Sequence, residues 1–291
     1  MINKVVIPAA GLGTRLFPAT KEQPKEMLPI FSTTAEGAPS VKPLLQLVFE
    51  QLYNCGLREF CYVVGREKRS IEDHFTPDQK YINMLEKMGK NGQATDLEEF
   101  YKKLETSTTM WVNQPEPKGF GNAVLMAQPF VQNEMFLVHA GDSCILSRNE
   151  DHIELMLETF KEFDADAVFI TLEIENPKQY GIVEGLEVKK GVYKVSKVVE
   201  KPDKPLTNLA IMAMYIFKPI IFDALKQITP GKGGEIQLTD AIQKLIDWNK
   251  KVYTVKLGNN YKHLDIGNPQ RYWEGLTLSY DLYCRGKSND R

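Results

Sequence analysis

Apolar runs and helical periodicities alternate along the first part of the chain. Residues 5–7 (VVI) form a continuous apolar run that ends at Pro8 and a glycine turn, a pattern typical of a strand buried on both faces. Apolar residues within 44–52 then keep helical spacing as far as Gly56, a residue type that commonly follows the last turn of a helix. This alternation predicts an α/β protein with a mainly parallel sheet and crossover helices.

The same rhythm continues towards Tyr180. Strands are expected at 60–64, 135–139 and 165–172, and helices after Gly121 and over 150–163. Residues 81–105 carry Lys, Glu, Met and Leu at helical spacing, and are interpreted as an inserted helical excursion. We expect this insertion to serve as a lid or as an oligomer contact.

The second part of the chain has a different pattern. Beyond Gly181, β-branched segments are separated by Gly185, Gly191 and Pro202, which predicts antiparallel strands. Methionine and aromatic residues alternate over 212–217 as they do in a strand. Their side chains are interpreted as sheet packing, not as a platform on which nucleic acid bases stack.

Two helical patterns, 236–248 and 269–282, finish the chain. The sequence has no internal repeat, low-complexity tract or flexible linker. We therefore predict one domain over 1–291, in which residues 1–180 form a first part and residues 181–291 a second.

Composition and charge exclude several classes of function. Lysine and arginine total 36 against 38 acidic residues, a formal charge of −2, so no general attraction to nucleic acid or to an anionic membrane is expected. Any phosphate binding must be local. The four cysteines lack CxxC spacing, which favours a reducing compartment, and the short apolar run near the start predicts neither a signal peptide nor a spanning helix. A cytoplasmic protein is the expectation.

The first candidate for chemistry is the glycine turn AAGLGTR at residues 9–15, which follows the first predicted strand. Open α/β sheets bind ligands at this end of their strands, and glycines let backbone N–H groups approach a phosphate closely. The turn is not a Walker loop, because no Gly-Lys-Ser/Thr follows. Leu16 occupies the third glycine position of GxGxxG, and no suitable acidic residue follows, which argues against a nicotinamide-dependent oxidoreductase. The turn alone is also consistent with a plain strand-to-helix connection.

A second motif follows at residues 23–29, QPKEMLP, where Lys25 stands between two prolines. Its ammonium group either reaches the phosphates held by the glycine turn or is a solvated surface charge. The strand, GLGTR and PKEMLP together resemble the nucleotidyltransferases that make nucleoside-diphosphate sugars. Further matching stretches come in the order of that family: QPEPKGFGNA at 114–123, GD at 141–142, YGIV at 180–183, VEKP at 199–202, NLAI at 208–211, GEIQLTD at 234–240 and DIG at 265–267.

This resemblance implies a Rossmann-like fold and a magnesium-dependent reaction. It is strongest to the branch that joins UTP to glucose 1-phosphate, with a thymidylyltransferase or a non-catalytic sugar-nucleotide sensor as alternatives; a homo-oligomer is also implied. By resemblance, Arg15, Lys25 and Lys201 are the catalytic cations, Ala10, Gly11, Gly13, Thr14, Gln114 and Gly119 bind the nucleotide, Gly181, Glu200 and Asn208 bind the sugar, and Asp142 and Asp265 bind Mg²⁺.

Chemistry supports this division of roles. Asp142 follows an apolar strand pattern, where a carboxylate can serve a hard magnesium ion, although a lone Asp there is more often a turn former or helix cap. Residues 143–144 (SC) depart from the family, which commonly carries another Asp or an Asn after the first. Glu200 and Lys201 would otherwise be an ordinary charge pair on an edge strand. The four histidines form no metal-ligand pattern and receive no catalytic role, and Cys144 is interpreted as packing.

Overall fold

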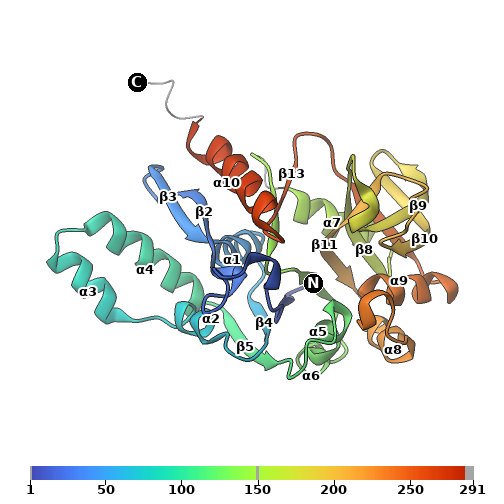
Figure 1. Ribbon diagram of the computed structural model, residues 1–291, viewed down its shortest axis with the longest axis horizontal. Helices are drawn as coiled ribbons and strands as arrows, with labels where there is room; N and C mark the ends of the chain where they lie inside the picture. The colour runs from blue at the N-terminus through green and yellow to red at the C-terminus, as the bar shows by residue number, and fades with distance from the viewer. Residues whose placement is uncertain (1, 149–150, 286–291) are drawn as a thin grey trace.

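The predicted strands form one mixed sheet that spans both parts of the chain (Figure 1). The computed structural model describes residues 2–148 and 151–285. Within these residues the main sheet has nine strands. In spatial order they are β5 (Thr108–Asn113), β4 (Glu59–Val64), β1 (Lys4–Ala9), β6 (Phe136–His139), β11 (Leu209–Phe217), β8 (Ala167–Glu173), β12 (Val252–Lys256), β10 (Val192–Glu200) and β9 (Gly181–Lys189).

Four neighbouring strands at one side of the sheet are parallel, and the remaining strands are mostly antiparallel. Strands β5, β4, β1 and β6 run parallel to one another. β11 is antiparallel to β6 and β8, and β10 is antiparallel to β12 and β9, whereas β12 runs parallel to β8. β9 and β10 form a hairpin whose turn contains Gly191 at φ 77°, a backbone conformation that glycine adopts without strain. The sheet as a whole is therefore mixed.

Helices cover both faces of this sheet. In chain order they are α1 (Leu44–Asn54), α2 (Arg69–His74), α3 (Gln79–Lys87), α4 (Asn91–Glu105), α5 (Phe120–Met126), α6 (Gln128–Val131), α7 (His152–Glu162), α8 (Ile220–Gln227), α9 (Leu238–Asp247) and α10 (Pro269–Tyr283). The predicted start of α7 at Glu150 lies outside the described residues. Short 3-10 turns are η1 (Thr14–Leu16), η2 (Lys25–Met27), η3 (Pro177–Gln179) and η4 (Lys232–Gly234). None of the helices among the described residues is long and apolar enough to cross a membrane.

Two further pairs of strands lie outside the main sheet. β2 (Pro29–Thr33) pairs with β3 (Pro39–Pro43), and β7 (Ser143–Leu146) pairs with β13 (Lys262–Asp265), both antiparallel. The second pair joins the two parts of the chain, because β7 belongs to the first part and β13 to the second. It also brings the two aspartates that were predicted to bind magnesium towards each other.

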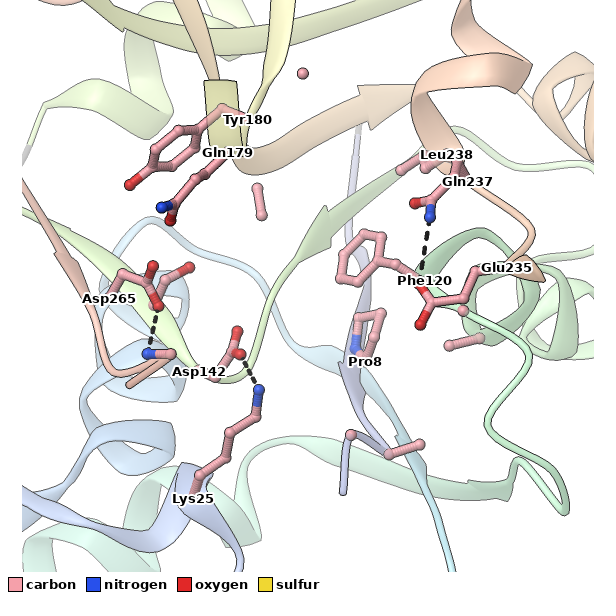
Figure 2. Close-up of a pocket in the computed structure, with 18 of the residues that line it drawn as sticks. Pro8, Lys25, Phe120, Asp142, Gln179, Tyr180, Glu235, Gln237, Leu238 and Asp265 are labelled. Atoms are coloured by element: carbon pink, nitrogen blue, oxygen red, sulfur yellow. Dashed lines mark hydrogen bonds and ion pairs between the residues drawn. The ribbon is translucent and has the colours of Figure 1, made fainter. Parts of the chain in front are cut away.

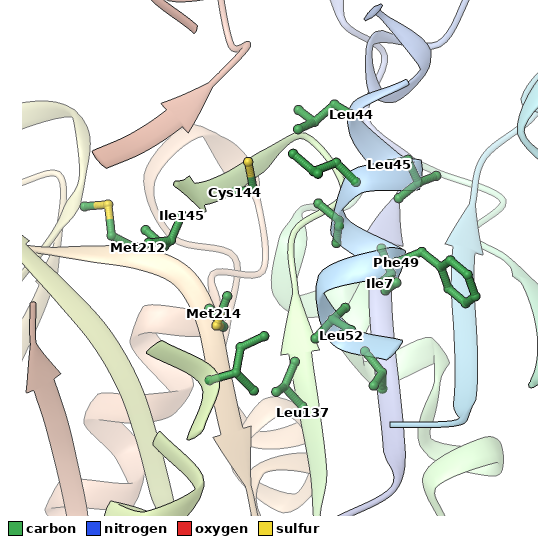
Figure 3. Close-up of a cluster of buried hydrophobic side chains, with 14 of the residues drawn as sticks. Ile7, Leu44, Leu45, Phe49, Leu52, Leu137, Cys144, Ile145, Met212 and Met214 are labelled. Carbon is green, nitrogen blue, oxygen red and sulfur yellow. The ribbon is translucent and has the colours of Figure 1, made fainter. Parts of the chain in front are cut away.

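The core has one cluster on each face of the sheet. Val5 and Ile7 of β1 belong to one cluster and Val6 to the other, which explains the continuous apolar run in the sequence. Figure 3 shows α1 packing Phe49 and Leu52 towards Ile7. Each such side chain that becomes fully buried stabilises the fold by roughly 1.5–3 kcal/mol. This packing fixes the strand ends from which the site is built.

The helical excursion consists of two helices, α3 and α4. They are separated by Gly89, whose φ of 71° suits a residue just beyond a helix end. The pair protrudes at one end of the molecule, while β9 and β10 lie at the other (Figure 1). No described residue of this pair lines the cavity of the candidate active site, and the role of the insertion stays a prediction.

Candidate active site

A cavity of about 980 Å³ lies between the two parts of the chain. All of the predicted site residues line it except Asn208, which is exposed at the start of β11 and whose backbone oxygen accepts a hydrogen bond from Ile174. Figure 2 shows Lys25 and Asp142 on one side of the pocket, with Glu235 and Gln237 across from Asp265. The structure thus gathers in one place motifs that are spread over most of the sequence.

The glycine turn and Lys25 lie against each other, as the sequence predicted. Gly13 has a left-handed φ of 66° and leads into η1, whose Leu16 is buried and anchors the turn. A β-carbon placed on Gly11 would lie 3.5 Å from Lys25 Nζ, so a larger residue there would press on the ammonium group. Backbone N–H groups and a cation therefore border the same space, which suits a polyphosphate.

Lys25 forms an ion pair with Asp142. Burial alone would lower the pKa of Lys25, but the carboxylates of Asp142 and Glu26 outweigh burial and raise it. Burial alone would likewise raise the pKa of Asp142, and Lys25 lowers it instead. Both groups are therefore charged at neutral pH, and the cavity wall carries a paired cation and anion.

The two candidate magnesium ligands lie on neighbouring backbone segments. Asp265, at the end of β13, pairs in register with Ser143, the residue after Asp142, and Ile266 N–H donates to the Asp142 carbonyl at 3.3 Å. Asp142 itself lies in the turn before β7, so it is not a helix cap. Among the described residues no group of three or more His, Cys, Asp or Glu side chains is arranged to hold a metal. Two carboxylates that border an open cavity fit a hard cation that takes its other ligands from phosphate and water, as Mg²⁺ does.

Glu200 and Lys201, which the resemblance assigned to the sugar and its phosphate, line the same cavity. Glu200 Oε1 lies 3.0 Å from Lys201 Nζ, and Glu200 Oε2 accepts a hydrogen bond of 2.7 Å from Thr239 Oγ1. Lys201 has φ 44°, an uncommon conformation for a residue other than glycine, and its N–H donates to Tyr180 O at 3.0 Å. A strained backbone conformation of this kind occurs mainly at functional sites, where the surrounding structure holds it in place. A β-carbon on Gly181 would lie 3.2 Å from Glu200 Oε2, so glycine leaves that carboxylate accessible.

Gln114 and Gly119 also line the cavity, and Gly119 lies against residues 235–236. The Gln114 amide donates to Gly119 O at 3.2 Å and to Asn122 Oδ1 at 2.8 Å. Because both of its N–H groups are used within the protein, the side-chain oxygen is the group left to accept a hydrogen bond from a ligand. Gly119, at φ 100° and ψ 171°, precedes α5 in a conformation that is essentially restricted to glycine.

A methyl group at Gly119 is expected to damage both stability and nucleotide binding. A β-carbon there would lie 2.7 Å from Glu235 Cβ and 2.9 Å from Ile236 O. We expect Gly119→Ala to lower the free energy of unfolding by about 2 kcal/mol or more and to raise KM for the nucleotide. Gly92→Ala is the matched control, because a β-carbon on Gly92 of α4 meets nothing within 4 Å. Denaturant unfolding and initial rates measure both effects; equal stability of the two variants would contradict the steric account.

Comparison with known proteins identifies the family. A family model described as "Nucleotidyl transferase" matches residues 4–279. The chain belongs to this family. The UTP–glucose-1-phosphate uridylyltransferase of Pseudomonas aeruginosa is 37% identical over 295 residues, which cover 99% of this chain and 100% of that relative.

Two solved structures resemble this nucleotidyl transferase over almost its whole length. One is a UDP-glucose pyrophosphorylase complexed with UDP-glucose, with a TM-score of 0.82 and 31% identity, covering 97% of this chain and 99% of that one. The other is the UTP-bound UGPase from Acinetobacter baumannii, with a TM-score of 0.83 and 27% identity, covering 99% and 98%. The mixed α/β fold is therefore shared with these enzymes.

Several side chains of the cavity received no role in the sequence analysis, among them Glu26, His263 and Arg271. Glu26 is buried and forms an ion pair of 3.0 Å with Lys68; burial raises its pKa. His263 lies two residues before Asp265, and its Nε2 has no hydrogen-bond partner among the described residues. Arg271, in the first turn of α10, forms an ion pair with Asp265. Glu26 adjoins Lys25 within a motif that was recognised in the sequence. The positions of His263 and Arg271 in the cavity depend instead on how β13 and α10 pack beside it.

Proposed function

We propose that this nucleotidyl transferase is a UTP–glucose-1-phosphate uridylyltransferase, which forms UDP-glucose and pyrophosphate from UTP and glucose 1-phosphate. The observation that carries the proposal is a single cavity in which a glycine turn with Lys25, a pair of aspartates and the Glu200–Lys201 pair meet. A nucleotide, a metal ion and a sugar phosphate each have a suitable surface there. The names of the relative and of the two solved structures support the same activity.

The main task of the site is to bring two anions together. The sugar phosphate must approach the α-phosphate of UTP, and two unit charges at 4 Å repel by about 4 kcal/mol at an effective dielectric constant of about 20. Arg15, Lys25 and Lys201 line the cavity and supply positive charge for both substrates. Because this type of transfer depends on alignment and charge neutralisation, we assign an in-line displacement without a covalent enzyme intermediate.

Asp142 and Asp265 would hold the magnesium ion. When bound, Mg²⁺ neutralises phosphate charge and orients the substrate oxygens. The two aspartates need not act as bases, because a sugar phosphate is already ionised at neutral pH. Asp142 forms an ion pair with Lys25. A triphosphate that attracts the Lys25 ammonium group would therefore leave the Asp142 carboxylate available to the metal ion.

We assign the nucleotide to the residues around Gln114 and the sugar phosphate to the residues around Glu200. The Gln114 side-chain oxygen can accept the ring N–H of a uracil, and Gly119 lets the base lie close to the backbone. Glu200 can accept hydrogen bonds from sugar hydroxyls, while Lys201 contacts the sugar phosphate. The first part of the chain, 1–180, would therefore hold mainly the nucleotide, and 181–291 mainly the sugar, within one catalytic domain.

We also propose that the chain forms a homo-oligomer. Tyr81 and Met84 of α3, and Met88 directly after this helix, are well exposed although they are apolar or aromatic. An apolar surface of this kind on a protruding element suits contact with a second copy of the chain.

Nucleotide choice is tested by initial rates of pyrophosphate release. UTP and dTTP are each combined with glucose 1-phosphate and with N-acetylglucosamine 1-phosphate at saturating magnesium. We expect the highest kcat/KM for UTP with glucose 1-phosphate. A higher kcat/KM for dTTP would instead identify a thymidylyltransferase, and tight UDP-glucose binding without turnover would identify a sensor.

A further inference from the structure

Arg271 lies directly on the carboxylate of Asp265. One guanidinium nitrogen, Nη1, donates to Asp265 Oδ2, and the other, Nη2, donates to Gln179 Oε1 at 2.8 Å. The guanidinium carbon also lies 5.0 Å from the centre of the Tyr180 ring, within the range of a cation–π contact. Arg271 thus connects a candidate magnesium ligand to the segment that leads into the sugar-side strand β9.

The backbone that carries Arg271 is fixed, whereas its side chain borders the cavity. Asn268 caps α10 by accepting a hydrogen bond of 2.9 Å from Arg271 N–H, and Pro269 occupies the first turn. The side chains of Arg271 and Asp265 are 21% and 17% exposed, so both can be reached by a ligand. Figure 2 shows Gln179 and Tyr180 on the same side of the pocket as Asp265.

Both oxygens of Asp265 are engaged in the structure. Oδ1 accepts a hydrogen bond of 2.7 Å from Gly267 N–H, and Oδ2 is held by Arg271. A magnesium ion at Asp265 would need one of these oxygens and would be repelled by the guanidinium group at the same place. Each carboxylate oxygen still has a second lone pair, so the guanidinium charge at Oδ2 competes with a metal ion for Asp265 without occupying every acceptor site.

Arg271 and Lys201 line the same cavity. The ring of Tyr180 lies 5.0 Å from the guanidinium carbon, and its backbone oxygen accepts the Lys201 N–H at 3.0 Å. Under the proposed function, the sugar phosphate at Lys201 would be the anion nearest to a released Arg271. The planar fork of a guanidinium group matches two phosphate oxygens at once, which a lysine cannot do.

We infer that the Arg271–Asp265 ion pair competes with magnesium for Asp265, and that Arg271 transfers to the phosphate of glucose 1-phosphate when the substrates bind, which leaves Asp265 for magnesium. This inference rests on the proposed function. Arg271 is then a substrate-binding residue, and binding of the sugar phosphate increases the affinity of Asp265 for the metal ion. Free metal would bind weakly, and the sugar phosphate would strengthen its binding.

Metal binding without substrates tests the first half. Mn²⁺ is used as the probe, and its dissociation constant is measured by electron paramagnetic resonance for the wild type, Arg271→Gln and Arg285→Gln. Arg285 is the matched control, because it is a 72% exposed arginine beyond the other end of α10, also paired with an aspartate, Asp281. We expect Arg271→Gln to bind Mn²⁺ about tenfold more tightly than the wild type, since a charge-assisted bond no longer competes. Arg285→Gln should match the wild type.

Steady-state kinetics test the second half. Arg271→Gln should raise KM for glucose 1-phosphate about tenfold or more while KM for UTP stays within about twofold, and Arg271→Lys should fall between the two. Unchanged Mn²⁺ affinity, or an unchanged KM for glucose 1-phosphate in an active enzyme, would overturn the inference. Equal losses in every parameter together with a lower melting temperature would show a structural role and also overturn it. If the wild type forms no UDP-glucose, the proposed function fails, whereas Mn²⁺ binding still reports on Arg271.

Discussion

Asparagine in place of Asp142 is expected to reduce turnover about 100-fold or more at limiting magnesium, with partial recovery at high magnesium. The substitution removes the negative charge that attracts the metal but keeps an oxygen ligand of similar shape. Because Asp142 is not required as a base, no proton transfer is lost. Asp265→Asn should behave in the same way, since both carboxylates border the same cavity.

Folding should change little in these variants, because the ion pairs of both aspartates lie at the wall of an open cavity. The measurement is the initial rate against magnesium concentration, together with a thermal melt. Asp281→Asn provides a control with the same chemical change at an exposed ion pair on α10. Wild-type rates of the variants at limiting magnesium would show that Asp142 and Asp265 are not metal ligands. A loss of activity that accompanies unfolding would show that their role is structural.

Removal of Lys25 is expected to have the second large effect, and one that differs from removal of Lys201. Lys25 borders the glycine turn, so Lys25→Ala should lower kcat about 100-fold through lost charge stabilisation at the triphosphate. Lys201 pairs with Glu200 at the sugar end, so Lys201→Ala should also raise KM for glucose 1-phosphate. Full kinetics with each substrate varied in turn separate the two roles.

An exposed lysine serves as the control for both variants. Lys102 of α4, which pairs only with Glu98 four residues earlier in the described part of the chain, can be changed to alanine without touching the cavity. Lys102→Ala should match the wild type. The same change in kcat and in both KM values for Lys25→Ala and Lys201→Ala would contradict a division of labour between the two cations.

The sequence predicted those parts of the fold in which local pattern and burial agree. The run at 5–7 is buried on both faces of the sheet and is apolar throughout, so β1 could be recognised without its neighbours. β5 was not predicted, because it is an edge strand in which three of the six residues are exposed and none is buried. Its position is set by pairing with β4, which no local pattern reveals.

Some residues of the candidate site are marked by a sequence motif, and others are brought to the cavity only by the fold. Asp142, Lys25 and Lys201 belong to motifs that the sequence displays, and the structure brings them to one cavity. Arg271 could not be predicted, because its role depends on the fixed start of α10 beside Asp265 and on the distant residues Gln179 and Tyr180. Asn208 was expected at the sugar and lies outside the cavity lining, so its role stays a prediction.

The most direct test of the proposed activity is identification of the product. The purified chain is incubated with UTP, glucose 1-phosphate and Mg²⁺, and the products are quantified by ³¹P nuclear magnetic resonance. The account predicts UDP-glucose and pyrophosphate in equal amounts, formed only when both substrates and the metal are present. A folded protein that binds UDP-glucose but forms neither product under these conditions would contradict it.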